Sequence, residues 1–531
     1  MMNLPDFHMK AGKASENTEN TMEAGNSKGG RGGTVRGFLS YFYGNFVVLL
    51  LGFIQTPLLT RILSTDEYGK TGMFETVVSV IYIFAILGLD QAYIRFYYEK
   101  NIDRGALLRR CITPALIIVT ALSAVYIIFS EPANVFLFGV NGKDVIALVI
   151  IYTFISVFER FFFLDVRMQQ NGRLYSNINI IEKVLSIFTI IAAFYLIGND
   201  FHIGLYALAV PWGITTSFLI IRYFYLRNLE AREALKGAEA SGTAGKSRKA
   251  IPGIQRNEYI PSYKELISYG VPFITVLLME WALSSCDKIA LRSFSSFDEL
   301  GIYTSAMKII VLLLTFKNTF IAYWSPIAME RFESGVNEEN KGFFRQAYEL
   351  VVMLCIIGAV LLILFRKIIV LLLGRDYRGA ETVIPFLTLM PIFAMMFEIT
   401  VQSIKFSKKG RYLNIASLIA LLVNIIGNIA LVPRLGGLGA AVTTGVSYIV
   451  YFAIGSYFAE RCIKVGYNYS KTAMYAILIV LYCAEASFIN NALYDTIFGV
   501  VLLALVCVID RNKIAGMLVK TREYISRKHI D

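Results

Sequence analysis

The sequence predicts an all-α, polytopic membrane protein with about fourteen transmembrane helices, and three observations support this fold class. Hydrophobic residues make up 56% of the 531 residues and charged residues only 17%, whereas about a quarter of the residues in soluble domains are charged. The apolar residues form long runs, and about 20 apolar residues are needed to cross the hydrocarbon core of a membrane. Lys and Arg gather in the short segments between these runs.

The apolar runs have the length of helices and not of barrel strands. A transmembrane β-barrel would show short segments in which apolar and polar residues alternate, because its strands face lipid and lumen in turn. We therefore expect helical spans near residues 37–62, 72–96, 108–130, 144–166, 177–198, 203–226, 264–291, 300–328, 344–366, 381–405, 411–432, 437–459, 470–490 and 492–510.

The basic residues indicate which loops face the cytoplasm, because Lys and Arg accumulate in cytoplasmic loops. With these spans, the basic clusters fall in the even-numbered loops and at the termini: Lys100, Arg104, Arg109, Arg110, Arg167, Arg173, Lys405, Lys408, Lys409, Arg411, Arg461, Lys464, Lys471 and residues 511–528. We predict a multi-pass protein of the bacterial inner membrane with both termini in the cytoplasm. One outer cluster is an exception that this rule does not explain: Arg366, Lys367, Arg375 and Arg378.

Charge and metal-ligating residues exclude several classes of protein. The formal net charge of +12 is spread over short loops between apolar runs, so we expect no nucleic-acid partner. Neither disulfides nor zinc sites are expected, because the cysteines lie in or beside apolar runs without a CxxC pair: Cys111, Cys286, Cys355, Cys462, Cys483 and Cys507. His8, His202 and His529 form no acid–base or metal constellation. We therefore predict no metal, no cofactor and no enzymatic activity.

Composition divides the chain into six parts. We expect a disordered cytoplasmic tail over 1–36, a first lobe of six spans over 37–227, a cytoplasmic interlobe linker over 228–262, a second lobe over 263–460, two further spans over 461–510, and a basic cytoplasmic tail over 511–531. Within the linker, AEASGTAGKS approaches a phosphate-binding loop. Ala240 stands where its first glycine is required and no apolar strand precedes it, so we interpret this segment as a flexible linker.

A short repeat supports the division into two lobes. Ser64, Asp66, Glu67 and Gly69 recur with the same spacing as Ser296, Asp298, Glu299 and Gly301, and IGLYALA at the sixth span is echoed more weakly by LGAAVTT at the twelfth. Six spans separate the copies, which therefore share one orientation. This pattern predicts two parallel six-helix lobes around a central cleft, with the last two spans as an appendage.

Charged residues inside the predicted spans are candidates for function, because a charge at the bilayer centre costs roughly 3 kcal/mol on insertion scales. The candidate cations are Arg61, Arg95, Lys288, Lys308 and Lys317. The candidate acids, which could pair with these cations or take up protons, are Glu75, Asp90, Glu280, Asp287 and Glu398.

The sequence leaves some of these roles open. Arg61, Arg95, Asp287 and Lys288 lie near predicted span ends, where side chains can simply extend to the lipid headgroups. Lys308 and Lys317 lie deeper among Ile, Val, Leu and Phe, which favours a position in a water-filled cavity. The aromatic segments YIRFYYEK and ERFFFLDVR are typical of an interfacial belt.

Four segments together resemble the Wzx-type polysaccharide biosynthesis proteins, the oligosaccharide-lipid flippases of the multidrug/oligosaccharidyl-lipid/polysaccharide (MOP) exporter superfamily. The segments are YGNFVVLLLGFIQTPLLTRILSTDEYG, LGLDQAYIRFYYE, LLLGRDYRGA and LVPRLGGLGAAVTTGVSY. The resemblance implies a V-shaped pair of six-helix bundles that opens alternately to each side. It also implies a cationic cavity for a polyprenyl-diphosphate-linked oligosaccharide, with contributions from Arg61, Arg95, Lys308 and Lys317.

These expectations define a function and its rivals. The predicted function is translocation of the lipid-linked oligosaccharide to the outer leaflet for surface polysaccharide synthesis, with membrane lipids and a polymerase and glycosyltransferase complex as partners. A multidrug antiporter of the same superfamily is the first alternative, although its cationic cargo would favour an acidic or apolar cavity. An O-antigen polymerase or ligase is the second, and it would require a larger outer loop than residues 131–143 provide.

Overall fold

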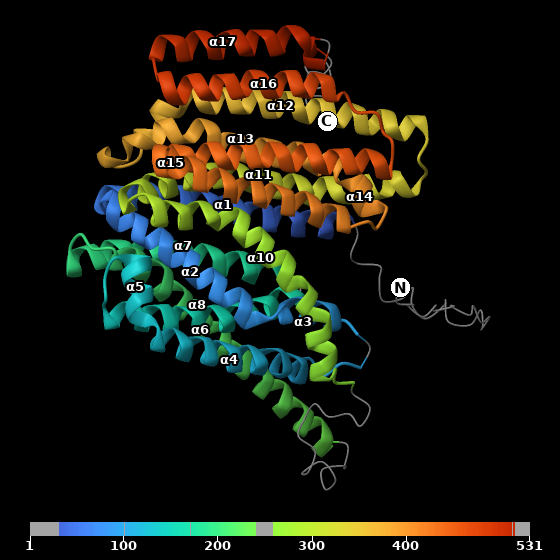
Figure 1. Ribbon diagram of the computed structural model, residues 1–531. Helices are drawn as coiled ribbons and strands as arrows, with labels where there is room; N and C mark the ends of the chain where they lie inside the picture. The colour runs from blue at the N-terminus through green and yellow to red at the C-terminus, as the bar shows by residue number, and fades with distance from the viewer. Residues whose placement is uncertain (1–30, 100, 170, 241–258, 512, 516–531) are drawn as a thin grey trace, which may run out of the picture.

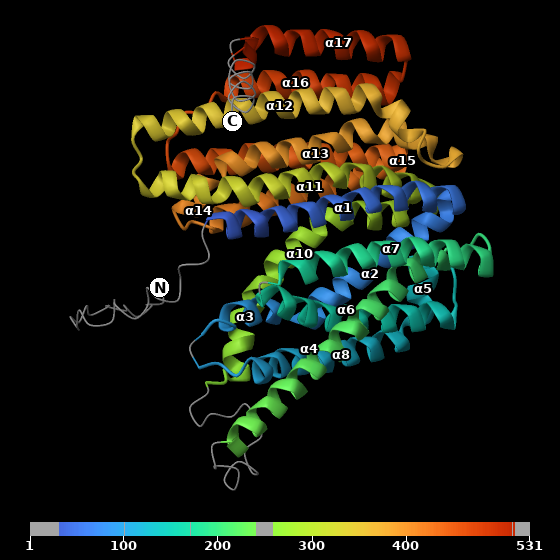
Figure 2. The same ribbon diagram turned by 180° about the vertical axis from the view of Figure 1, so that it is seen from behind.

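Helices account for every named element in the computed structural model, which describes residues 31–99, 101–169, 171–240, 259–511 and 513–515. Figures 1 and 2 show their arrangement from opposite sides. The α-helices are α1 (Arg31–Ile62), α2 (Thr65–Ile86), α3 (Leu89–Phe96), α4 (Arg104–Ile128), α5 (Ser130–Phe138), α6 (Lys143–Met168), α7 (Gly172–Ile197), α8 (His202–Ala240), α10 (Tyr263–Phe294), α11 (Phe297–Glu333), α12 (Glu338–Val370), α13 (Ala380–Thr400), α14 (Gln402–Phe406), α15 (Arg411–Cys462), α16 (Tyr469–Ala484) and α17 (Ala492–Ile509). A 3-10 turn, η2 (Arg375–Gly379), precedes α13, and a π-helical turn, η3 (Glu485–Ile489), follows α16.

The predicted fold class is confirmed. Twelve helices in the described ranges are long and apolar enough to cross a membrane, and Val47–Ile62 within α1 forms a shorter apolar stretch. α15 contains two of the predicted spans, because the chain bends at Gly436, where φ is 53° and ψ is −131°. Pro433, which removes a backbone donor, lies just before the bend. Each predicted span therefore coincides with helical structure.

Several predicted boundaries are wrong, because an apolar pattern does not report where a helix continues with polar residues. α1 begins at Arg31, inside the segment that we predicted to be a disordered tail, and α8 continues to Ala240, inside the predicted linker. The second predicted span is two helices, since α2 ends at Ile86 and α3 begins at Leu89. Residues 1–30, 241–258 and 516–531 of the predicted tails and linker lie outside the described residues.

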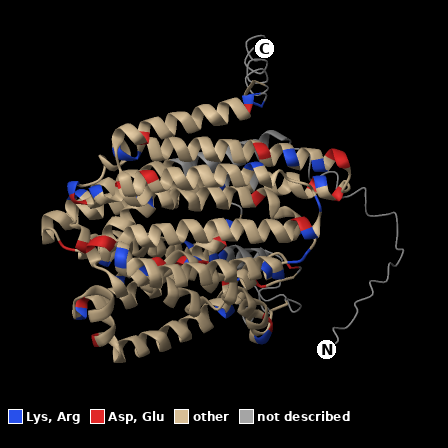
Figure 3. Ribbon diagram, turned by 45° about the horizontal axis from the view of Figure 1, so that its top comes forward, with Lys and Arg blue, Asp and Glu red and all other residues tan. Residues whose placement is uncertain are grey.

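The helices form two parts, with α10 between them. We call α1–α8 the first half and α10–α17 the second half. α10 packs against α2 and α3 of the first half and against α15 of the second, and both views show it crossing between the two groups. α1 packs mainly on α7 and also touches α11. Figure 3 shows long uncharged stretches along the helices, with many charged residues near helix ends.

The repeated motif forms a close contact between the halves. Ser64 and Ser296 cap α2 and α11, each accepting a hydrogen bond from the backbone N–H three residues later, at 3.3 and 3.2 Å. A Cβ atom on Gly69 would lie 2.2 Å from the carbonyl oxygen of Phe297, and one on Gly301 would lie 1.9 Å from a backbone oxygen of α2. Only glycine therefore permits the two helices to cross so closely.

Further hydrogen bonds join the halves beside this crossing. Thr65 Oγ1 donates to Asp298, and the hydroxyl of Tyr377 donates to the carbonyl oxygens of Leu63 and Ser64 at 2.9 and 2.8 Å. We call residues 60–72, 296–304 and 374–377 the sealed end. Because the two backbones touch at the glycines and these hydrogen bonds join the halves beside them, the sealed end is closed in this conformation.

Two equivalent glutamates hold each half together at the sealed end. Glu67 accepts a hydrogen bond from the backbone N–H of Phe201, just before α8, at 2.6 Å. Glu299 accepts one from the backbone N–H of Gly437, where the second part of α15 begins, at 2.7 Å. A carboxylate that accepts from the first N–H groups of a helix is also favoured by the helix dipole. The weak echo between the sixth and twelfth spans therefore marks two equivalent contacts.

A buried ion pair attaches the last two spans and accounts for part of the unexplained basic cluster. Arg366 is fully buried and donates to both carboxylate oxygens of Asp495 on α17, at 2.8 and 2.9 Å. It also donates to the carbonyl oxygen of Ala486 at 2.9 Å, and Lys367 lies 3.0 Å from Asp495. Arg366 and Lys367 therefore hold helices together, and their position does not report which side of the membrane the loop faces.

Candidate functional site

The centre of the candidate site is an ion pair that joins the two halves. Glu75 lies on α2 and Lys308 on α11, and the Lys308 Nζ atom donates to the two carboxylate oxygens at 2.9 and 3.0 Å. The pair lies roughly three turns into each helix from the sealed end, which places it near mid-membrane. The Lys308 side chain is 37% exposed and that of Glu75 is 27% exposed, so neither member of the pair is fully enclosed by protein.

Two further lysines lie close to this pair. The ammonium groups of Lys183 on α7 and Lys288 on α10 both interact electrostatically with the Glu75 carboxylate. Lys183 also lies 3.9 Å from Glu182. Among the described residues, Lys288 has no carboxylate within 4 Å. The structure thus brings together two of the predicted cations, Lys288 and Lys308, with one predicted acid.

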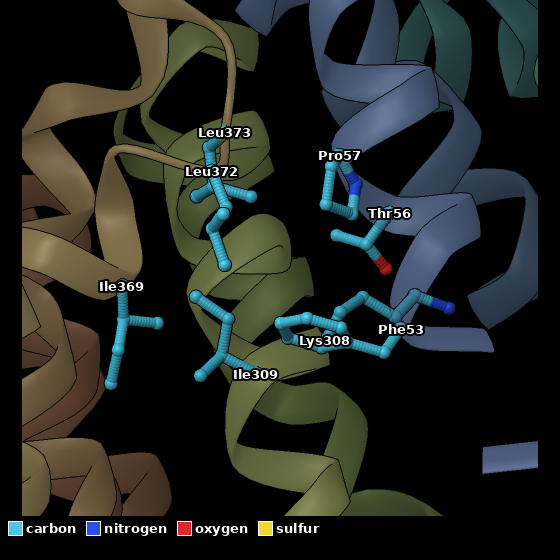
Figure 4. A pocket seen from close by; sticks show the side chains of 8 residues that line it. All are labelled: Phe53, Thr56, Pro57, Lys308, Ile309, Ile369, Leu372 and Leu373. Carbon is cyan, nitrogen blue, oxygen red and sulfur yellow. The ribbon is translucent and has the colours of Figure 1, made fainter. Parts of the chain in front are cut away.

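The space beside Lys308 is narrow in this conformation. Figure 4 shows the Lys308 side chain extending toward α1, and the pocket around it is lined by Phe53, Thr56, Pro57, Lys308, Ile309, Ile369, Leu372 and Leu373. Its volume of about 10 Å³ corresponds to roughly one water molecule. A sugar or diphosphate could therefore reach Lys308 here only after the helices move apart.

Lys317 and Glu398 form a second pair, within the second half. Glu398 on α13 lies 3.8 Å from Lys317 on α11 and 3.3 Å from Lys405. The Lys317 and Glu398 side chains are 22% and 15% exposed. This pair lies more than two turns of α11 beyond Lys308, so it is separate from the first pair.

Other predicted residues lie away from the central pair. Arg61 is exposed at the end of α1, and Arg95, whose side chain is 54% exposed, pairs with Glu99 at 3.1 Å. Glu280 is exposed on α10. Asp90 pairs with Arg160 of α6, with Nε and NH2 distances of 3.1 and 2.5 Å.

Asp287 lies in a buried polar cage of the second half. It is 1% exposed, and it accepts hydrogen bonds from Tyr303 at 2.5 Å, Asn424 at 3.0 Å and Asn428 at 2.8 Å, as well as from Thr444. All these donors are neutral. Among the described residues Asp287 has no cation within ion-pair distance, and such a buried carboxylate is suited to binding a proton or a small cation.

Sequence reasoning missed several charged residues, two of them near the central pair and one beside Asp90. Arg160, Lys183 and Glu182 all lie inside predicted spans, and Trp212 donates to Glu182 at 2.8 Å. The signal was present, because a charge within a span is a functional candidate by default. The aromatic residues beside Arg160 favoured its interpretation as part of an interfacial belt, so its ion pair with Asp90 was not predicted.

The helical arrangement is that of known membrane transporters. A solved structure of the lipid II flippase MurJ in an inward closed conformation matches with a TM-score of 0.59 and 16% identity, over 89% of this chain and 99% of that chain. An inward-facing multidrug resistance MATE family transporter of the MOP superfamily matches with a TM-score of 0.55 and 17% identity, over 81% of this chain and 99% of that one. At this identity, the likeness establishes the fold alone.

The family follows from the sequence comparison. The profile of the polysaccharide biosynthesis protein family matches residues 34–332, more than half of the chain, and the chain belongs to this family. A relative from Methanocaldococcus jannaschii, described as the uncharacterized membrane protein MJ1068, is 25% identical over 496 residues, covering 86% of this chain and 91% of the relative. The resemblance seen in the four sequence segments is confirmed.

Proposed function

We propose that this membrane protein is a flippase that moves a polyprenyl-diphosphate-linked oligosaccharide from the inner to the outer leaflet for surface polysaccharide synthesis. The observation that carries this proposal is the position of Lys308 and Lys288 at the contact between two halves of a MOP fold. Membership of the polysaccharide biosynthesis family supports the class of cargo. The prediction that both termini are cytoplasmic belongs to the same proposal.

The cationic site answers the physical problem of this cargo. Neither sugar nor diphosphate is solvated by hydrocarbon, while the polyprenyl tail can stay in the lipid. Lysine ammonium groups form short, charge-assisted hydrogen bonds with phosphate oxygens and so offset the loss of hydration. An inside-negative potential of 100 mV would favour outward movement of the anion by about 2.3 kcal/mol per charge.

Alternating access would use the sealed end as one of two gates. Under the predicted topology this end faces outward, so the conformation described here is closed to the outside. Opening would require α2 and α11 to separate at Gly69 and Gly301. The bonds from Glu67 and Glu299 lie within each half and would survive that movement.

Asp287 is the residue that we assign to coupling. Asp287 lies on α10 and its neutral donors lie on α11 and α15, so uptake of a proton or sodium ion would change the packing of these helices. Because α10 also packs against the first half, the change could reach the contact between the halves. Glu398 and Lys317 remain candidate cavity residues in this proposal.

The test is complementation of a strain that lacks the chromosomal gene. Lys308→Ala and Lys288→Ala should reduce surface polysaccharide at least tenfold while the protein level in membranes is unchanged. Lys341→Ala is the control, because Lys341 pairs with Glu338 at the start of α12, away from the contact between the halves. Full complementation by both site variants would refute the proposal. Efflux of cationic dyes that depends on Lys308 would favour the multidrug antiporter instead.

A further inference from the structure

We propose that Glu75 is a stand-in for the anionic group of the cargo. Glu75 pairs with Lys308 while no cargo is bound, and a phosphate group of the cargo displaces Glu75 from Lys308. This inference rests on the proposed function and deepens it, because it names the residue whose release reports cargo binding. The exchange involves only ion pairs, with no covalent step.

The geometry of Glu75 suits a displaceable ligand. Within the described residues, its only hydrogen-bond donor is the Lys308 ammonium group, which reaches both carboxylate oxygens. A purely structural carboxylate is usually fixed by several donors, as Asp495 is by Arg366 and Lys367. Glu75 is also partly exposed, so its charge can be rehydrated once Lys308 has changed partner.

The surrounding charges favour an incoming anion. Lys183, Lys288 and Lys308 interact with the single carboxylate of Glu75; Lys183 also lies 3.9 Å from Glu182, and Lys288 also interacts with the buried Asp287 beside it in the chain. In the described part of the chain, however, Lys288 has no carboxylate within ion-pair distance. A diphosphate could bind Lys288 directly and replace Glu75 as the partner of Lys308. Two ammonium groups would then contact one anion.

The exchange also affects the contact between the halves. The Glu75–Lys308 pair connects α2 with α11, and the same two helices cross at Gly69 and Gly301. When Lys308 binds the cargo, one bond between the halves is lost beneath the sealed end. An empty carrier thus keeps the bond, whereas a loaded one is freer to open.

Equilibrium binding tests this inference. The probe is farnesyl diphosphate, a short polyprenyl diphosphate, added to the full-length protein in detergent. In wild type, part of its binding energy is used to displace Glu75, so Glu75→Gln should bind the probe about tenfold more tightly, which corresponds to about 1.4 kcal/mol. In Lys308→Gln the probe should bind at least tenfold more weakly, and the double variant should match Lys308→Gln.

Glu338→Gln controls for net charge. It removes one negative charge from the exposed first turn of α12, where Glu338 pairs with Lys341 and Arg345 of the same helix, so probe affinity should be unchanged. Glu75→Ala serves as a second variant if Glu75→Gln does not fold. Equal or weaker binding by a folded Glu75 variant overturns the inference and leaves the proposed function standing. Absence of probe binding to wild type overturns both.

Discussion

Gly69 of α2 and Gly301 of α11 approach each other so closely that the added Cβ of either would overlap the backbone of the opposite helix. The two glycines occupy the same position in the repeated motif, and the helices that carry them belong to different halves. This crossing therefore gives the sealed end its tightness, and it leads to the first prediction.

Replacing Gly301 should prevent the sealed end from closing. In Gly301→Val, the Cβ would lie 1.9 Å from the Thr65 carbonyl oxygen, and backbone cannot move aside as a flexible side chain can. Overpacking of this kind costs about 1–3 kcal/mol, so the population should shift toward the opened state. A cysteine introduced at Tyr68, which is 3% exposed, should then react faster with a membrane-impermeant maleimide.

The matched control for this substitution is Gly358→Ala on α12, where an added Cβ would meet nothing within 4 Å. It should leave the labelling rate of the Tyr68→Cys protein unchanged. Equal labelling of the Gly301→Val and Gly301 proteins would show that the crossing does not limit opening at this end.

Removing one member of the Arg366–Asp495 pair should destabilise the protein strongly. Asp495→Ala leaves the fully buried Arg366 charge without its carboxylate, and breaking a buried pair in this way costs about 3–5 kcal/mol. Thermal unfolding in detergent should show the loss. The double variant Arg366→Met/Asp495→Leu should regain part of the stability, since the uncompensated charge is removed. A loss below about 1 kcal/mol for Asp495→Ala would contradict a structural role for the pair.

Asp287→Asn should uncouple transport from an ion gradient. The substitution keeps the shape of the side chain but removes its charge, and the new amide group would face donors from Tyr303, Thr444, Asn424 and Asn428. We expect a stability cost of about 1–3 kcal/mol. In proteoliposomes, transport of a labelled lipid-linked oligosaccharide should lose its response to imposed proton and sodium gradients.

The comparison that decides this prediction is Asp90→Asn, which alters a buried carboxylate that has a cationic partner, Arg160. That variant should keep its gradient response even if its stability falls. A gradient response in Asp287→Asn equal to that of wild type would remove Asp287 from the coupling mechanism.

The sequence was sufficient for the fold class but not for the pairing of charges. Transmembrane spans can be predicted from the sequence because the hydrocarbon core imposes a minimum apolar length on each helix, whichever helices it packs against. Partners depend on how helices rotate and cross, and a single sequence does not record this. Lys308 and Glu75 could be named as intramembrane charges, but their contact across the two halves could not. Arg366 did not follow the rule that basic residues accumulate in cytoplasmic loops, because it pairs with Asp495 on a helix far along the chain.

The two glutamate bonds and the glycine crossing are repeated about the contact between the halves. Such a contact, in which one patch meets its own equivalent, is what two copies of a six-helix chain would form as a symmetric dimer. The sealed end thus has, within one polypeptide, the geometry of a symmetric subunit interface. Glu67 and Gly69 have their counterparts in Glu299 and Gly301, so a single substitution in this chain alters only one of two equivalent contacts.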